Sequence, residues 1–171
     1  MRRRILILVA VLTMSFAGIA YATPKDDWPN INGELEINSD DLDMTIEGGP
    51  KNDELLGGHG DDVIYGRRKH DVIWGDHKAT GNTKRQTDTI YGGAGKDWIY
   101  ASHGKNIIDG GAGDDTIRVW FGRGRVDCGS GNDDILYVSK TQNKKVKRKN
   151  CERVLHKSAK DAVNDRNGLY D

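Results

Sequence analysis

The chain has 171 residues, enough for one domain, and its 26 Lys and Arg balance 26 Asp and Glu to a formal net charge of zero. That balance excludes a generally basic nucleic-acid-binding protein and an acidic disordered tail protein. Only 36% of the residues are hydrophobic and 22 are glycine, so stability is expected to need a repeated backbone motif, a metal or a covalent cross-link.

Residues 1–22 have the pattern of a secretory signal peptide. Arginines at the start precede an apolar run, and Ala20-Tyr21-Ala22 forms an A-x-A cleavage site. The apolar run is shorter than the roughly 20 residues that span a membrane, so a retained anchor is the less favoured interpretation. We therefore expect a secreted, extracellular protein whose mature chain begins at Thr23 and has no membrane span.

Residues 23–47 are predicted to form N-terminal cap strands. Such a cap is expected because the open end of a stack of strands is an exposed strand edge. Apolar residues alternate through the segment and are predicted to face inwards. They are Leu35, Ile37, Leu42, Met44 and Ile46.

Residues 48–136 repeat with a period of nine. The nonamers GGHGDDVIY, GGAGKDWIY and GGAGDDTIR share glycine at places one, two and four, aspartate at place six and isoleucine at place eight. Place eight is aliphatic in every full repeat: Leu55, Ile64, Ile73, Ile90, Ile99, Ile108, Ile117, Val126 and Ile135. Place six is mostly aspartate: Asp53, Asp62, Asp71, Asp88, Asp97, Asn106, Asp115, Gly124 and Asp133.

A nine-residue unit has room for one short strand and one turn. The place-eight side chain would point inwards from the strand, and the glycines would permit positive φ angles in the turn. Such a turn aims backbone carbonyls to one side, and its aspartate adds a carboxylate. Oxygen ligands of this kind are the ones that Ca²⁺ prefers, and two nonamers would make one coil of 18 residues.

These nonamers resemble the RTX, or haemolysin-type, calcium-binding nonapeptide repeat G-G-x-G-x-D-x-U-x, in which U is a large aliphatic residue. The resemblance implies an all-β fold, a right-handed parallel β-roll, with Ca²⁺ as cofactor. Because each coil buries only two aliphatic side chains, we expect the repeats to become ordered when calcium binds. The chain lacks the catalytic and pore-forming parts of larger RTX proteins, so protease and toxin activities do not carry over.

The resemblance also implies calcium ligands from turns that are 18 residues apart. The first turn of a site gives carbonyls from places two and four, the second gives carbonyls from places one and three, and each gives its aspartate. The first predicted site comprises Gly93, Gly95, Asp97, Gly110, Ala112 and Asp115. The second comprises Gly111, Gly113, Asp115, Cys128, Ser130 and Asp133, and Asp62 lies in a further glycine-rich turn.

The segment GDHKATGN, residues 75–82, interrupts the nine-residue register. It is either a shortened repeat or an inserted loop. Counted as a shortened repeat, it places the glycine-rich turns that begin at Gly57, Gly92, Gly110 and Cys128 on one edge of the roll, which would be the calcium edge. The pairs Asp53 with Asp71, and Asp71 with Asp88, would then be weaker candidates on the other edge.

Residues 137–157 are predicted to form a C-terminal cap, and residues 158–171 a disordered tail. Cys128 and Cys151 are the only cysteines. In an oxidising compartment they are expected to form one disulfide, worth about 3 kcal/mol on the chain-entropy model.

Four aromatic residues occupy place nine, next to the inward-facing column: Tyr65, Trp74, Tyr91 and Tyr100. They would either bind sugars on the flanks of the roll or shield neighbouring strands, and the second interpretation is favoured. No HExxH or G-x-S-x-G motif occurs, so no enzyme activity is predicted. We expect an extracellular calcium-binding module, structural or binding, with a cell-surface glycan or protein as partner. The alternative is a calcium-dependent carbohydrate-binding adhesin.

Overall fold

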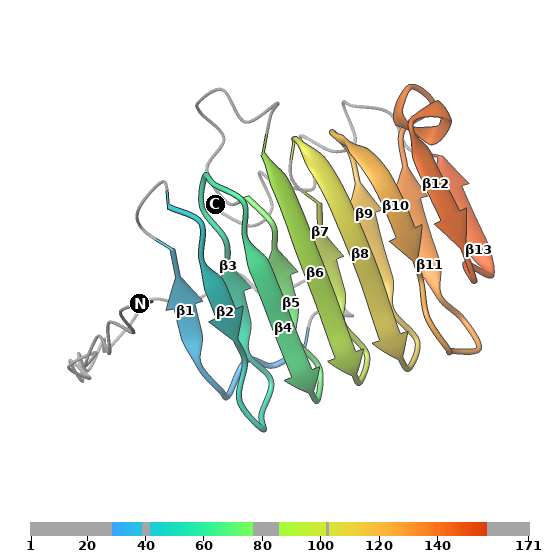
Figure 1. The fold of residues 1–171 in the computed structure, drawn as a ribbon. Coiled ribbons are helices and arrows are strands. Elements are labelled where there is room, and N and C mark those ends of the chain that lie inside the picture. The colour runs from blue at the N-terminus through green and yellow to red at the C-terminus, as the bar shows by residue number, and fades with distance from the viewer. Residues whose placement is uncertain (1–28, 39–41, 77–85, 102, 157–171) are drawn as a thin grey trace, which may run out of the picture.

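The computed structural model describes residues 29–38, 42–76, 86–101 and 103–156, and within them the chain coils through two parallel sheets (Figure 1). The odd-strand sheet contains β1 (Leu35–Ile37), β3 (Glu54–Leu56), β5 (Val72–Trp74), β7 (Trp98–Tyr100), β9 (Thr116–Val119), β11 (Ile135–Val138) and β13 (Arg153–His156). The even-strand sheet contains β2 (Thr45–Glu47), β4 (Val63–Arg68), β6 (Thr87–Ala94), β8 (Lys105–Ala112), β10 (Arg123–Asp127) and β12 (Val146–Lys149). A short 3₁₀ helix, η2 (Gln142–Lys144), precedes β12.

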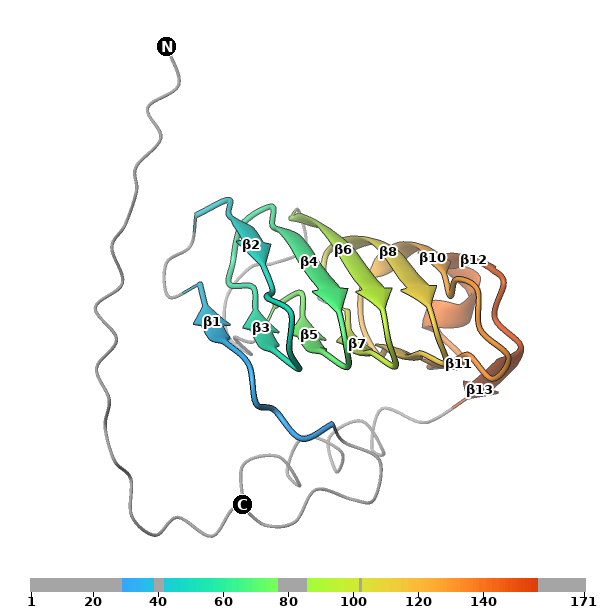
Figure 2. The same ribbon diagram turned by 90° about the horizontal axis from the view of Figure 1, so that it is seen from below.

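The two sheets face each other as layers (Figure 2), and the place-eight residues fill the space between them. Each strand pairs with the strand one coil along, so Ile99 lies beside Ile117 and Ile108 beside Val126. These side chains are 2% exposed or less. The predicted parallel β-roll is therefore confirmed, and its core is two aliphatic columns rather than a globular interior.

The coil that contains the segment GDHKATGN, of which residues 77–82 lie outside the described residues, is eight residues longer than an 18-residue coil. Ile64 pairs with Ile90 and Ile73 with Ile99, each 26 residues apart, where an uninterrupted coil has 18. The interpretation as a shortened repeat is wrong, and the turn at Gly57 lies on the opposite edge from the turn at Gly92. Eight residues are close to one nonamer, so spacing alone did not separate a repeat from a loop.

The last repeat is one residue longer than predicted. Leu136 pairs with Ile117 and is fully buried, whereas Ile135, predicted to face inwards, pairs with Thr116. The extra residue lies in the turn before β11, because Gly131 still approaches Gly113 at the 18-residue spacing. A one-residue slip exchanges the two faces of a strand.

The N-terminal cap also differs from its prediction by one residue. Ile46 is fully buried and Met44 packs against the core, as expected. In β1, however, Glu36 pairs with Leu55, so a charged residue stands at the end of the inward-facing column. The three other predicted inward residues are exposed: Leu35 by 61%, Ile37 by 48% and Leu42 by 61%.

The predicted disulfide between Cys128 and Cys151 is present. Cys128 is fully buried in the core at the end of β10, and Cys151 packs against the same core after β12. The bond therefore fastens the last coil, and β13 continues the odd-strand sheet beside β11.

A second hydrophobic cluster covers the outer face of the odd-strand sheet. Trp74 and Tyr100 stack with ring centroids 3.9 Å apart and are only 9% and 8% exposed. Ile31 packs against this cluster, and the Arg118 guanidinium lies 4.4 Å from the centroid of Trp98. These two place-nine aromatics therefore shield the sheet and present no open ring face.

Candidate metal centre

Five aspartates form one column along the edge where the chain passes from the even-strand to the odd-strand sheet. They are Asp53, Asp71, Asp97, Asp115 and Asp134, and all are fully buried. We call them the aspartate column. The backbone N–H of each donates to Oδ1 of the next, for example from Asp97 to Asp115 at 2.9 Å and from Asp115 to Asp134 at 2.7 Å. Each carboxylate is thereby held in a fixed orientation between two coils.

The second carboxylate oxygen is free along most of the aspartate column. Oδ2 of Asp71, Asp97, Asp115 and Asp134 is buried and has no hydrogen-bond partner among the described residues. Asp53 differs, because its Oδ2 accepts the N–H of Gly49 at 2.6 Å. A buried carboxylate oxygen without a donor is costly, so these four carboxylates would be stabilised by an electrostatic partner.

The place-one glycines keep the gap between successive turns clear for oxygen atoms. A Cβ atom built on Gly92 would lie 2.3 Å from the carbonyl oxygen of Gly110 and 2.8 Å from Oδ2 of Asp97. On Gly110 it would lie 2.1 Å from the carbonyl oxygen of Cys128 and 2.6 Å from Oδ2 of Asp115. The carboxylate of one turn and a carbonyl of the next therefore converge in each gap.

The glycines at places two and four have the backbone angles that the turn needs. Gly111 has φ 104° and Gly113 has φ 124°, and both approach the carbonyls of the preceding turn too closely for a side chain. The same places in an earlier turn hold Arg67 and Lys69, with φ 77° and 80°. Even without glycine, that turn takes up the shape of its neighbours.

Within the described ranges, no three side chains of His, Cys, Asp and Glu gather into a metal-binding cluster. A cation held here would thus have backbone carbonyls and one carboxylate from each of two turns as ligands. Oxygen-only ligation suits Ca²⁺, whereas zinc sites in proteins use cysteine and histidine. The unpartnered Oδ2 atoms and the glycine-lined gaps fit a calcium ion.

Burial raises the pKa values of the aspartate column. The pKa of Asp71 and of Asp97 rises to about 7, mainly through desolvation. Desolvation raises the pKa of Asp115 to about 8, and the neighbouring carboxylates of Asp97, Asp134 and Asp114 add to the effect. A bound cation would favour the ionised form and release these protons.

The metal-free roll is therefore expected to lose stability as the pH rises. The ordinary pKa of an aspartate is 3.8. Between about pH 4 and 8 the metal-free folded state binds more protons than the unfolded state, so its stability falls as pH rises. Circular dichroism in EGTA should show more residual β-structure at about pH 5 than at pH 8, and calcium should release protons only from protein that is already folded. Identical metal-free spectra at the two pH values would contradict this account.

The structure brings the residues of the first predicted site into two adjacent turns. Gly93 pairs with Gly111 and Ala94 with Ala112, and Asp97 lies one coil before Asp115. The predicted ligand set is Gly93, Gly95, Asp97, Gly110, Ala112 and Asp115. That these atoms bind the ion stays a prediction.

The second predicted site is brought together except for its last aspartate. Ala112 bridges to Ser130, so the turns with Gly111, Gly113 and Cys128 are stacked as expected. Asp134 occupies the column, however, and Asp133 is exposed and paired with Arg153 at 3.1 Å. The prediction for Asp133 is wrong by one residue, because the preceding turn is longer by one.

The turn from Gly66 to Asp71 belongs to the aspartate column, although its sequence predicts only a weaker calcium candidate. Asp71 lies one coil before Asp97, not beside Asp88, because the insertion separates the two turns by 26 residues. The column also continues to Glu152, whose Oε2 accepts the N–H of Asp134 at 3.0 Å. Counting 18 residues from Asp134 would have identified Glu152.

Asp62 lies on the opposite edge, where its contacts are different. Its Oδ2 accepts the N–H of Gly58 at 3.0 Å, and its own N–H donates to Oδ1 of Asp88 at 3.2 Å. A Cβ on Gly57 would lie 2.2 Å from the carbonyl oxygen of Gly75. Glycine-rich turns therefore occur on both edges, and the prediction of one calcium edge that includes Gly57 is wrong.

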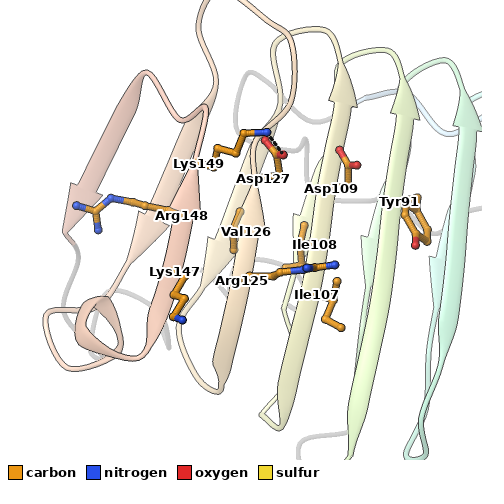
Figure 3. Close-up of a pocket in the computed structure, with 10 residues that line it drawn as sticks. All are labelled: Tyr91, Ile107, Ile108, Asp109, Arg125, Val126, Asp127, Lys147, Arg148 and Lys149. Carbon is orange, nitrogen blue, oxygen red and sulfur yellow. Dashed lines mark hydrogen bonds and ion pairs between the residues drawn. The ribbon is translucent and has the colours of Figure 1, made fainter.

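On the outer face of the even-strand sheet, Tyr65 and Tyr91 stack with ring centroids 4.9 Å apart, and Tyr91 is 38% exposed. Beside Tyr91 lies an open groove of about 460 Å³ (Figure 3). Six of the ten residues that line it are charged: Asp109, Arg125, Asp127, Lys147, Arg148 and Lys149. Figure 3 shows Arg125 reaching towards β8 and Lys149 paired with Asp127.

Comparison with known proteins identifies the repeat. The family model for the RTX calcium-binding nonapeptide repeat matches residues 45–73 and 85–117 in four copies. The two matched ranges stop at the insertion on either side and contain the turns of Asp53, Asp62, Asp71, Asp97 and Asp115. No curated protein and no solved structure matches the chain.

Proposed function

Because this chain is an RTX-type repeat protein, and such repeats bind Ca²⁺, we propose that it is a secreted calcium-binding module whose roll becomes ordered when the ions bind. The observation that carries the proposal is the set of buried, unpartnered Oδ2 atoms along the aspartate column. Those of Asp71, Asp97 and Asp115 each stand in a gap that the place-one glycine of the same turn keeps clear for oxygen atoms. Calcium would supply the positive charge that these carboxylates lack.

Three gaps along the aspartate column are the proposed ion sites. They lie between the turns of Asp71 and Asp97, of Asp97 and Asp115, and of Asp115 and Asp134. In the middle gap the ligands would be the carbonyls of Gly93, Gly95, Gly110 and Ala112 with the two aspartates. The first gap would use Arg67 and Lys69 carbonyls instead, because these residues hold places two and four.

An extracellular, structural role is the second part of the proposal. RTX repeat proteins are typically extracellular, and the pattern of residues 1–22 favours export, although that segment lies outside the described residues. No helix in the described part of the chain is long and apolar enough to cross a membrane. The repeat family is generally structural, and we propose no enzyme activity.

A calcium titration followed by far-UV circular dichroism tests the proposal. After removal of metal with EGTA, added Ca²⁺ should convert a largely disordered spectrum into a β spectrum, because the carboxylates repel one another without a cation. Mg²⁺ at equal ionic strength is the control, since it prefers a rigid octahedral site and keeps its waters. A spectrum that is already β and indifferent to calcium would refute the proposal.

Glycan binding is a second candidate, confined to the even-strand sheet. Tyr91 and the groove beside it (Figure 3) favour that face, whereas Trp74 and Tyr100 are buried. A glycan array with the calcium-loaded protein and with Tyr91→Ala tests it. Binding lost in the variant while calcium binding persists would support this candidate, and an array without hits would reject it.

A further inference from the structure

The roll has two open ends. Within the described residues, β1 and β2 are the last strands at one end and β12 and β13 at the other (Figure 1). Among the strands that the structure describes, none pairs with the outer backbone donors and acceptors of these end strands. Because every pairing in both sheets is parallel and follows one axis, a second copy shifted along that axis would add strands in the same direction.

Charge is segregated between these two ends. Residues 29–47 contain six acidic residues and no Lys or Arg, whereas residues 140–156 contain seven Lys and Arg and one Glu. The whole chain has a formal net charge of zero. An acidic first coil and a basic last coil attract each other in two copies placed end to end, and like ends repel.

The inward-facing columns also end in charged residues of opposite sign. Glu36 takes the place next to Leu55 at the N-terminal end, and Arg148 takes the place next to Val126 at the C-terminal end. The N-terminal end further exposes Leu35, Ile37 and Leu42, and β13 exposes Leu155 by 37%. Most of the exposed large apolar side chains therefore lie at the two ends of the roll.

We propose that the C-terminal end of one chain stacks on the N-terminal end of a second copy, with β13 pairing with β1 and β12 with β2 in parallel. Continuing the existing register places Ile37 beside Leu155 and Glu47 beside Lys149. The two surfaces differ and lie at opposite ends of the roll, so each copy can bind one further copy at each end. The assembly is therefore a linear series and not a closed dimer. This proposal is independent of the proposed calcium function, except that the roll must be folded.

Sedimentation velocity of the folded protein in calcium tests the stacking. From about 1 to about 500 µM at low salt, the protein should pass from monomer through dimer and trimer to longer species, and roughly 0.5 M NaCl should reverse this because it screens the end charges. A protein that stays monomeric throughout, with a β spectrum in circular dichroism, would overturn the proposal. In that case the end charges serve only to prevent strand-edge aggregation.

Charge reversals give the sharper form of the test. Glu36→Lys alone and Arg148→Glu alone should each weaken self-association at least tenfold, whereas Lys105→Glu, an exposed mid-roll change on β8, should not. An equimolar mixture of the two end variants should associate again, because the unchanged acidic end of one variant meets the unchanged basic end of the other and the two reversed ends are also complementary. Circular dichroism in calcium checks that each variant folds. Failure of the mixture to associate, or equal weakening by the control, would contradict stacking between copies.

Discussion

Asp115→Ala is expected to reduce calcium binding as strongly as Asp97→Ala and more than any other single substitution in the aspartate column, because only these two stand between two proposed ion gaps. Asp115 stands between two proposed ion gaps, since its neighbours in the column are Asp97 on one side and Asp134 on the other. Removing it takes one ligand from each. With calcium present, we expect the free energy of unfolding to fall by about 3 to 5 kcal/mol, as when one partner of a buried charge pair is lost.

Without calcium, the same substitution should have a much smaller effect. The wild-type carboxylate is then a buried acid whose Oδ2 has no partner, and alanine removes that cost. The substitution also removes the acceptor for the Asp97 N–H, which costs about 1 to 3 kcal/mol and opposes this gain. Isothermal titration calorimetry and thermal unfolding in Ca²⁺ measure the loaded state, and circular dichroism in EGTA measures the residual β-structure of the metal-free state. Unchanged calcium binding in the variant would contradict a calcium-ligand role.

Asp134→Ala and Asp133→Ala form the matched pair for this experiment. The two residues are adjacent, but Asp134 is buried in the column and Asp133 is exposed beside Arg153. We expect Asp134→Ala to weaken calcium binding and Asp133→Ala to leave it within about twofold, because exposed ion pairs contribute little. The reverse result would support the register that the nine-residue period predicts, with Asp133 in the column.

Gly110→Ala is expected to be nearly as damaging, although it changes no charge. The added methyl group would lie 2.1 Å from the carbonyl oxygen of Cys128 and 2.6 Å from Oδ2 of Asp115. It would occupy the space where these two oxygens converge, and the backbone carbonyl cannot move away as a flexible side chain would. In the presence of calcium, we expect the free energy of unfolding to fall by about 3 kcal/mol, which is at the upper end for overpacking. Calorimetry should also show that fewer calcium ions bind.

Gly49→Ala is the control for this substitution. Gly49 lies in the first turn on the same edge, but an added Cβ would meet nothing closer than 3.5 Å, the Oε1 atom of Glu34. The substitution should change the free energy of unfolding by less than about 1 kcal/mol. Alanine restricts the unfolded chain more than glycine does, and this gain offsets the cost of any minor steric contact in the folded state. Equal losses for both glycines would mean that backbone flexibility, and not oxygen ligation, explains the glycine pattern.

The nine-residue period determined the fold class, the aliphatic columns and the repeated chemistry of the turns. Ile99 and Ile117 lie in the core, and Asp97 lies beside Asp115, as spacing alone predicts. The pairing of Cys128 with Cys151 also followed from the sequence. These features are local, because a turn and a short strand within one nonamer decide where each side chain points.

Only the tertiary structure decided the register between coils. Strand pairing showed that the coil containing residues 75–82 is eight residues longer than an 18-residue coil, which places Asp71 beside Asp97 and moves Gly57 to the opposite edge. It also placed Asp134 in the column instead of Asp133, and Glu36 instead of Ile37 opposite Leu55. The physical reason is that a roll aligns coils through hydrogen bonds and packing between strands far apart in sequence, whereas a repeat count assumes that every coil has equal length.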